Sequence, residues 1–406
     1  MIAGLDLCEC PGGVTAPRGF LADGLYCGIR KAKKDLALIV SQAPATVAAV
    51  FTQNKTQAAP VLVDKMQLKR ATTCSAVLVN SGNANACTGE RGLNDAWSMV
   101  RKTAQALGIP EEHVWVYSTG VIGQHLPMDK IDSGIRQLAV QLSRSGGHRA
   151  AEAIMTTDTF PKQYAVRFAL GSSEVTVGGM AKGSGMIAPN MATMLAFITT
   201  DASVPPQLLQ LALRRANERS FNRISVDGDM STNDMVLILA NGLAGNDPLT
   251  VDSEAFTAFS DALEHVLVTL AKMIARDGEG ATKLVEISVT GAAVEEQAVR
   301  AARSVANSNL VKTAIHGADA NWGRIMAALG SSGIDFKPEA VEIAFNDLPV
   351  LKQNFVIVLN EERAREVLSQ DTITVRVNLN QGPASARFWT CDLTKQYVHI
   401  NASYRS

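Results

Sequence analysis

Cysteine and long apolar runs are both scarce in this chain of 406 residues. Its six cysteines are too few for a disulfide framework at this length, which favours reduced thiols. The apolar runs, such as Leu36–Val40, fall far short of the roughly 20 residues that span a bilayer. No basic residue precedes the first apolar stretch, so a secretory signal is not expected and a cytoplasmic location is favoured.

The chain also lacks an excess of either charge. Its 38 lysine and arginine residues nearly balance its 39 aspartate and glutamate residues, which leaves a formal net charge of -1. Proteins that bind nucleic acid or an anionic membrane usually present a basic surface, and this balance predicts neither partner. The hydrophobic fraction of 47% is sufficient for a large core, and the length suggests two or three domains.

Two groups of residues could suggest a metal site. Cys8, Cys10 and Cys27 could hold a soft metal, but no second pair at zinc-finger spacing accompanies them. The acidic loop 227–234 fails the calcium-binding loop pattern, since its sixth position is Thr232 where the pattern requires glycine. Backbone capping is the better interpretation of that loop, and we expect neither a metal nor a cofactor.

Apolar periodicity indicates strands and helices along the whole chain. One helix is expected over residues 94–107, with Asn94 at its start and a stop at Gly108–Pro110. Strands are expected over 35–40, 46–52, 75–79, 114–117, 235–240 and 283–290, and further helices over 129–145, 205–220, 253–276, 294–306 and 361–368. This mixture predicts an α/β or α+β layered fold.

The densest chemical signal is the segment Val177–Ala202, VGGMAKGSGMIAPNMATMLAFITTDA. A phosphate-binding loop places its lysine after the last glycine, whereas Lys182 precedes Gly183, so nucleotide binding is set aside. Thr193 begins the apolar, strand-like part. It could be an ordinary strand former. It could also be a nucleophile at the start of a processed chain, where an α-amine of pKa about 7.7–8.0 would activate its hydroxyl.

The string KGSGMIAPNMATMLAFITTDA resembles the cleavage-site signature of the ornithine acetyltransferase family, also called the glutamate N-acetyltransferase family. Other blocks follow in the family's order over nearly the whole chain: GVTAPRGF (13–20), NSGNANACTG (80–89), STGVIG (118–123), MTTDTFPK (155–162), FNRISVDGDMSTND (221–234), RDGEGATK (276–283) and the ending CDLTKQYVHINASYRS. On these blocks the chain is identified as a member of this family.

The resemblance implies an enzyme of arginine biosynthesis that cuts itself at the Ala192–Thr193 bond, giving pieces 1–192 and 193–406. The freed Thr193 would take an acetyl group from N-acetylornithine and pass it to glutamate, with acetyl-CoA left open as a second donor. Relatives assemble from two copies of each piece. The family fold is an αββα sandwich spanning both pieces, which predicts a layered catalytic core over residues 1–280 and a smaller C-terminal α/β domain, closing the active site, over residues 281–406.

The resemblance also assigns roles to individual residues. Thr119 and Gly120 would form the oxyanion hole that a tetrahedral intermediate requires, although from the sequence alone they suggest a plain turn. Lys182 suits an α-carboxylate or the oxyanion, and Glu279 suits an amine of ornithine. The substrate contacts are assigned to Thr156, Lys182, Thr193, Glu279, Asn401 and Ser406.

The end of the chain departs from many relatives. Ser406 stands where a threonine is common, which keeps a hydroxyl and a terminal carboxylate, and Ser403 stands where an aspartate is common. His316 could be read as a general base, but in the family the base is the α-amine of Thr193. A structural role of His316 beside Asp319 is therefore preferred.

Two other functions stay open. With water as the acceptor, the same N-terminal threonine would give an aminopeptidase or amidase. A protein that has the fold but binds without catalysis is the third candidate. Lys182, Glu279 and the tail positions Asn401 and Ser406 suit a charged amino-acid substrate and favour acetyl transfer over the hydrolase. The oxyanion pair and the cleavage site count against the binding protein, and failure to self-cleave would favour it.

Overall fold

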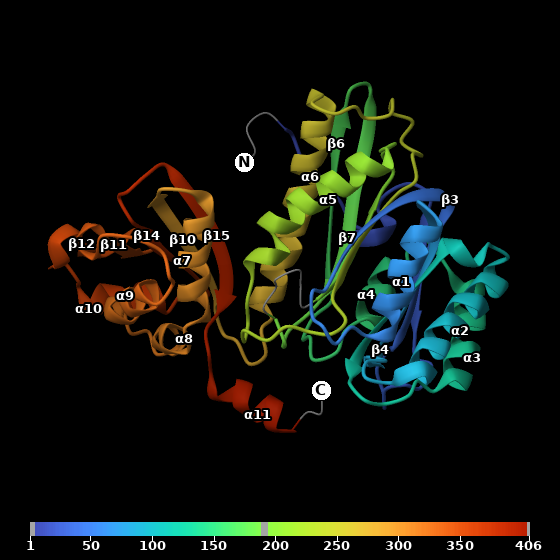
Figure 1. Ribbon diagram of the computed structural model, residues 1–406, viewed down its shortest axis with the longest axis horizontal. Coiled ribbons are helices and arrows are strands. Elements are labelled where there is room, and N and C mark those ends of the chain that lie inside the picture. Colours follow the sequence, from blue (N-terminus) through green and yellow to red (C-terminus); the bar gives the residue numbers. More distant parts are fainter. Residues whose placement is uncertain (1–4, 188–193, 404–406) are drawn as a thin grey trace.

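The computed structural model describes residues 5–187 and 194–403 (Figure 1). Within them, one sheet of nine strands has the order β1-β6-β7-β8-β9-β3-β4-β5, with β2 beside β3. Its strands are β1 (Cys8–Glu9), β2 (Phe20–Leu25), β3 (Leu36–Phe51), β4 (Thr73–Asn83), β5 (Val114–Val121), β6 (Lys162–Leu170), β7 (Ser173–Lys182), β8 (Leu195–Thr200) and β9 (Met235–Ala240).

The helices that accompany this sheet are α1 (Ala59–Arg70), α2 (Gly89–Leu107), α3 (Met128–Gln141), α4 (Gly147–Ala153), α5 (Pro206–Arg219) and α6 (Glu254–Arg276). α6 begins where the sequence predicts, because the Ser253 hydroxyl accepts a hydrogen bond from the Phe256 N–H and caps the first turn. Among the described residues, no helix has both the length and the apolar content needed to cross a bilayer.

The long strand β3 belongs to two layers. Residues 36–40 pair with β2 and β4, whereas residues 46–51 pair with β9, and the register shifts between Val40 and Ala45. Pro44 lies in the shifted stretch, where its missing N–H removes a ladder bond. β3 therefore connects β4 and β5 on one side to β6–β9 on the other.

These two parts of the sheet pack face to face across a shared apolar core. Val77 and Tyr117 contribute from β4 and β5, and Met180 and Phe197 from β7 and β8. The rings of Tyr117 and Phe197 meet edge to face with their centroids 4.7 Å apart. α5 and α6 cover the outer face of β6–β9, and α1–α3 cover the outer face of β3–β5 (Figure 1). This order of layers confirms the predicted αββα sandwich.

A second sheet of six strands, in the order β13-β12-β11-β14-β10-β15, lies beside the sandwich (Figure 1). Its elements are β10 (Leu284–Ala292), α7 (Glu295–Asn307), α8 (Asn309–His316), α9 (Trp322–Gly330), β11 (Glu342–Phe345), β12 (Leu348–Lys352), β13 (Val356–Ile357), α10 (Glu361–Leu368), β14 (Thr372–Asn378) and β15 (Ala384–Cys391). The division of the chain at residue 280 stays a prediction.

The last helix, α11 (Lys395–Ser403), leads from this second sheet back toward the sandwich (Figure 1). The two parts also meet directly, since the Ser225 N–H donates to the Trp389 carbonyl at 2.9 Å. The buried ammonium of Lys312 donates to the Val226 carbonyl at 2.5 Å. These contacts join the second sheet to the loop that precedes β9.

Candidate active site

One cavity opens where β5 and β7 end, where β8 and β9 begin, and where α11 returns to the sandwich. The predicted site residues that lie in the described part of the chain all line it, and they are Thr119, Gly120, Thr156, Lys182, Glu279 and Asn401. Ala192, Thr193 and Ser406 lie outside the described residues. Met194, the residue that follows Thr193 in the sequence, also lines the cavity.

One wall of the cavity, the oxyanion wall, consists of Thr119 and Gly120 at the end of β5. The backbone there is fixed by uncharged contacts. Ser118 donates from its hydroxyl to the Asn80 side chain at 2.6 Å, and the Asn233 amide donates to the Ser118 carbonyl at 2.8 Å. The wall can therefore present the Thr119 hydroxyl and the Gly120 N–H in a preorganised position, as an oxyanion hole requires.

Gly120 is required at its position for steric reasons. Its φ is 132°, a value that favours glycine, and a Cβ there would lie 2.3 Å from the Gly82 carbonyl carbon on β4. Only glycine lets β4 and β5 approach this closely at the cavity. The sequence interpretation of a plain turn at Ser118–Gly120 gave no sign of this, because the neighbour comes from a distant part of the chain.

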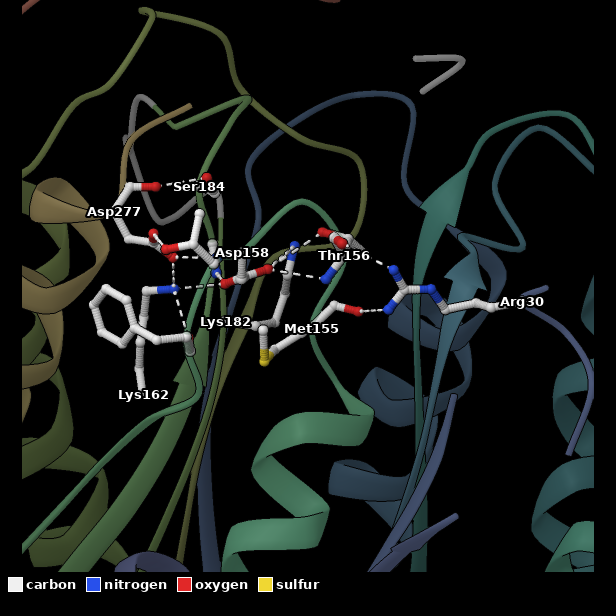
Figure 2. A network of polar contacts seen from close by, with 11 residues as sticks. Arg30, Met155, Thr156, Asp158, Lys162, Lys182, Ser184 and Asp277 are labelled. Atoms are coloured by element: carbon white, nitrogen blue, oxygen red, sulfur yellow. Dashed lines mark hydrogen bonds and ion pairs between the residues drawn. The ribbon is translucent and has the colours of Figure 1, made fainter. Parts of the chain in front are cut away.

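A second wall, the ammonium wall, carries Lys182 at the end of β7. Its ammonium lies 3.9 Å from the carboxylate of the buried Asp158. Asp158 in turn accepts from the Lys162 ammonium at 2.7 Å and from the Gly183 N–H at 2.7 Å. Lys162, whose side chain is 0% exposed, also pairs with Asp277 at 2.6 Å. Figure 2 shows this chain of alternating charges, which runs from Asp277 through Lys162 and Asp158 to Lys182.

The alternation of charges decides the protonation of this wall. Burial alone would raise the pKa of Asp158, but the charges of Lys162 and Lys182 outweigh it and hold the pKa below its usual value. Burial lowers the pKa of Lys182, and the Asp158 carboxylate opposes that shift in part. Asp158 therefore stays ionised and helps Lys182 to keep its proton.

The same carboxylate positions Thr156. The Thr156 N–H donates to Asp158 at 2.9 Å, and the Arg30 guanidinium donates to the carbonyls of Met155 and Thr156 at 2.6 and 3.0 Å (Figure 2). The Asp158 carboxylate thus contacts both Thr156 and Lys182 and fixes the positions of two residues that lie far apart in the sequence.

Glu279 and Asn401 form the side of the cavity nearest α11. The Asn401 amide donates to the Glu279 carboxylate at 2.7 Å. Gly185 lies so close to Glu279 that a Cβ there would meet the Glu279 carboxyl carbon at 2.3 Å. A carboxylate and a lysine in one cavity supply the charges that an amino acid with a free amine and a carboxylate requires.

The acidic loop before β9 also reaches the cavity. Asp227 accepts hydrogen bonds from the backbone N–H groups of Met186 and Ile187 at 2.6 and 2.8 Å, and from the Tyr397 hydroxyl at 3.2 Å. Its carboxylate thus ties the glycine-rich segment to α11, which is a positioning role. Among the described residues, no group of three His, Cys, Asp or Glu side chains has an arrangement suited to a metal ion.

The remaining candidates lie away from the cavity. His316 contacts Asp392 at 2.9 Å and is not among the lining residues. Cys8, Cys10 and Cys27 carry free thiols. The sequence reasoning gave no separate role to Asp158, Lys162 or Asp277, although the first two belong to the block MTTDTFPK. The sequence did contain one signal for them: Asp158 and Lys162 carry opposite charges and stand four residues apart in a block specific to the family.

The sequence matches known proteins over almost its whole length. The model of the ArgJ family matches residues 21–406. The arginine biosynthesis bifunctional protein ArgJ of Symbiobacterium thermophilum is 54% identical over 398 residues, which cover 97% of this chain and 99% of that protein. The chain is also similar to a solved structure, that of the arginine biosynthesis bifunctional protein argJ of Bacillus halodurans. The two are 49% identical with a TM-score of 0.51, and the match covers 52% of this chain and 100% of that chain.

A second solved structure is that of the ornithine acetyltransferase of Mycobacterium tuberculosis complexed with ornithine. It is 43% identical, has a TM-score of 0.43, and covers 46% of this chain and 100% of that chain. The family match and the identity of 54% to a relative of nearly equal extent confirm the resemblance that the sequence blocks suggested. The chain therefore belongs to the ArgJ family and is an acyltransferase.

Proposed function

We propose that this enzyme transfers an acetyl group from N-acetylornithine to glutamate, in arginine biosynthesis, through an acetyl ester on Thr193. The observation that carries the proposal is the convergence of two walls on one cavity. Thr119 and Gly120 offer an oxyanion hole, and Lys182 and Glu279 line the same cavity. Met194 on the same cavity joins this machinery to Thr193 by a single peptide bond.

Self-cleavage between Ala192 and Thr193 is the first step of the proposal. Cleavage gives Thr193 a free α-amine. Because this amine and the Thr193 hydroxyl belong to the same residue, the amine can act as the base that accepts the hydroxyl proton. The observation behind this step is the position of Met194, which lines the cavity and directly follows Thr193 in the sequence.

The transfer then proceeds in two balanced halves. The Thr193 hydroxyl adds to the acetyl carbonyl, the bond from that carbonyl to the ornithine nitrogen breaks, and the nitrogen leaves with the proton held by the α-amine. Glutamate then attacks the ester through its own amine, and Thr193 recovers its hydroxyl proton. Thr119 and Gly120 stabilise the oxyanion that forms in each half.

Substrate recognition follows from the charged groups. Lys182 binds the α-carboxylate that both amino acids share, and Glu279 binds the free amine of N-acetylornithine. Thr156, Asn401 and Ser406 complete the contacts to the substrate. We also propose a cytoplasmic enzyme that assembles from two copies of each piece, with acetyl-CoA open as a second acetyl donor.

The test of the proposal is the kinetic order. Because the acetyl group waits on Thr193, ornithine can leave before glutamate enters, and initial rates should follow a ping-pong pattern. Thr193→Ala should remain uncut and inactive. Intersecting initial-rate lines from a cleaved enzyme would contradict the covalent route. Release of acetate at the same rate without glutamate would instead favour an amidase.

A further inference from the structure

Asp234 is a carboxyl group of the cavity wall to which no role has yet been given. It directly precedes β9, lines the cavity and is 2% exposed. Its carboxyl group receives hydrogen bonds from the Ser231 side chain and from the backbone N–H groups of Ser231 and Met194. Its Oδ2 atom, however, has no hydrogen-bond partner among the described residues. A buried polar atom without a partner is costly, which indicates that something else meets it.

Within the described part of the chain, Asp234 has no cation to itself. Lys182 faces the cavity from β7, but its ammonium already lies next to Asp158 at 3.9 Å. The other ionisable groups that line the cavity are acids and a phenol: Asp227 and Asp229 from the loop before β9, Glu279 from the turn after α6, and Tyr397 from α11. A second buried negative charge in this setting would be repelled rather than paired.

Asp158 shows the opposite arrangement a short distance away. Lys162 pairs with it at 2.7 Å, and its pKa is held low, whereas burial raises the pKa of Asp234 well above its usual value and Lys182 opposes this only in part. Two carboxyl groups on either side of Lys182 are thus driven to different protonation states. Such a pair marks a division of roles, because a neutral acid can donate a hydrogen bond and a carboxylate cannot.

We propose that Asp234 carries a proton and donates it in a hydrogen bond from Oδ2 to the substrate α-carboxylate that Lys182 binds, an assignment that rests on the acetyl transfer proposed above. An anion next to Lys182 would be repelled by an ionised Asp234 but is stabilised by the neutral acid. Lys182 then supplies the charge that attracts the α-carboxylate, and the hydrogen bond from Asp234 fixes the orientation of that carboxylate. Because both substrates share the α-carboxylate, the contact serves donor and acceptor alike.

The experiment compares Asp234→Asn with Asp234→Ala in the full, self-processed enzyme. Asparagine is neutral, has nearly the same shape and can donate from its amide, so KM for N-acetylornithine should stay within about threefold of wild type. Alanine cannot donate, and KM should rise on the order of 10-fold to 100-fold, the range for a hydrogen bond to a charged group. kcat should change little in both variants, since the contact exists before the transition state.

The pH dependence gives a second, independent measurement. Wild-type KM should rise as the pH passes through the deprotonation of Asp234. In Asp234→Asn that rise should disappear, and the remaining rise in KM should be the one that accompanies the loss of the Lys182 proton. Asp158→Asn is the matched control. The same substitution removes a carboxylate that must be charged, and it should move the rise in KM to lower pH without abolishing it.

Three results would overturn the assignment. Asp234→Asn could be as impaired as Asp234→Ala, which would mean that an ionised carboxylate is needed. Both variants could retain wild-type KM, which would mean that no contact exists. The Asn variant could keep the wild-type dependence of KM on pH, which would mean that Asp234 does not cause it. If the Ala variant does not fold, the pH dependence of the Asn variant is sufficient to test the assignment. Failure of the wild type itself to transfer acetyl would instead contradict the proposed function, whatever the variants do.

Discussion

The two walls of the cavity are held in place by different kinds of interaction. The oxyanion wall, Thr119 and Gly120, rests on uncharged hydrogen bonds such as the one from Asn233 to the Ser118 carbonyl at 2.8 Å. The ammonium wall rests on buried ions, with Lys162 between Asp158 and Asp277 at 2.7 and 2.6 Å. The interactions that hold the oxyanion wall involve no charged group and should not change with pH. The interactions that hold the ammonium wall involve charged groups and should change with pH.

The difference follows from what each wall meets. An oxyanion exists only during the reaction, so neutral donors that are already in position stabilise it without attracting an anion beforehand. A substrate carboxylate is charged from the start, and the wall that binds it needs a permanent cation. Burying that cation is unfavourable, which is why a chain of alternating charges lies behind Lys182.

The largest expected effect comes from breaking the ion chain. Lys162→Met removes the cation that separates two buried carboxylates, and the free energy of unfolding should fall by about 3–5 kcal/mol. Chemical denaturation measures it. Lys34→Met is the matched control, because Lys34 pairs with Glu152 at 2.6 Å but on the surface, with both side chains 36% exposed. It should cost less than about 1 kcal/mol. Equal losses would show that burial is not what matters.

The oxyanion wall should respond in rate and not in stability. Thr119→Ala should lower kcat by roughly 100-fold to 1,000-fold, the usual loss on removing one donor, with little change in KM. Thr119→Ser keeps the hydroxyl and should recover most of the rate. Steady-state kinetics on fully cleaved protein measures both. A raised KM at unchanged kcat would reassign Thr119 to substrate binding.

A smaller effect is expected on the pH response of the ammonium wall. The Asp158 anion favours the charged form of Lys182, so Asp158→Asn should lower the Lys182 pKa further. KM for N-acetylornithine should then begin to rise with pH at a correspondingly lower pH. Thr119→Ala should leave that profile in place. An unchanged profile in Asp158→Asn would disconnect Asp158 from substrate binding.

The smallest effect is expected at α11, where contacts are partly open to solvent. Asn401→Ala removes the hydrogen bond to Glu279 at 2.7 Å, and KM for N-acetylornithine should rise less than about 10-fold. Asn401→Asp is the informative companion, because it places a like charge against Glu279 and should be worse than alanine. If both variants behave as wild type, α11 does not orient Glu279.

The sequence predicted elements well where the pattern was local. It predicted two strands over 35–40 and 46–52, and the structure has one strand, Leu36–Phe51, whose two halves lie in different layers. The bulge around Pro44 interrupts the apolar pattern without ending the strand. The helix expected to begin at Asn94 begins at Gly89, where no side-chain cap marks the boundary in the sequence.

The residues of the candidate site could be predicted only where the family assigns a role to the matching position. Thr119, Lys182 and Glu279 came from family blocks, and the structure brings them to one cavity. Asp158 and Asp234 could not be recognised as important from the sequence, because burial decides their charge and burial depends on strands far apart in the chain. Asp234 had drawn attention only as part of an acidic loop, with no indication that one of its oxygens lacks a partner.

The central claim is that an acetyl group rests on Thr193 between the two substrates, and intact mass spectrometry tests it most directly. Purified protein should separate into pieces 1–192 and 193–406. Incubation with N-acetylornithine alone should add the mass of one acetyl group to the second piece, and glutamate should remove it. A single uncut chain that is active, or transfer without any acetylated piece under rapid quench, would contradict the account.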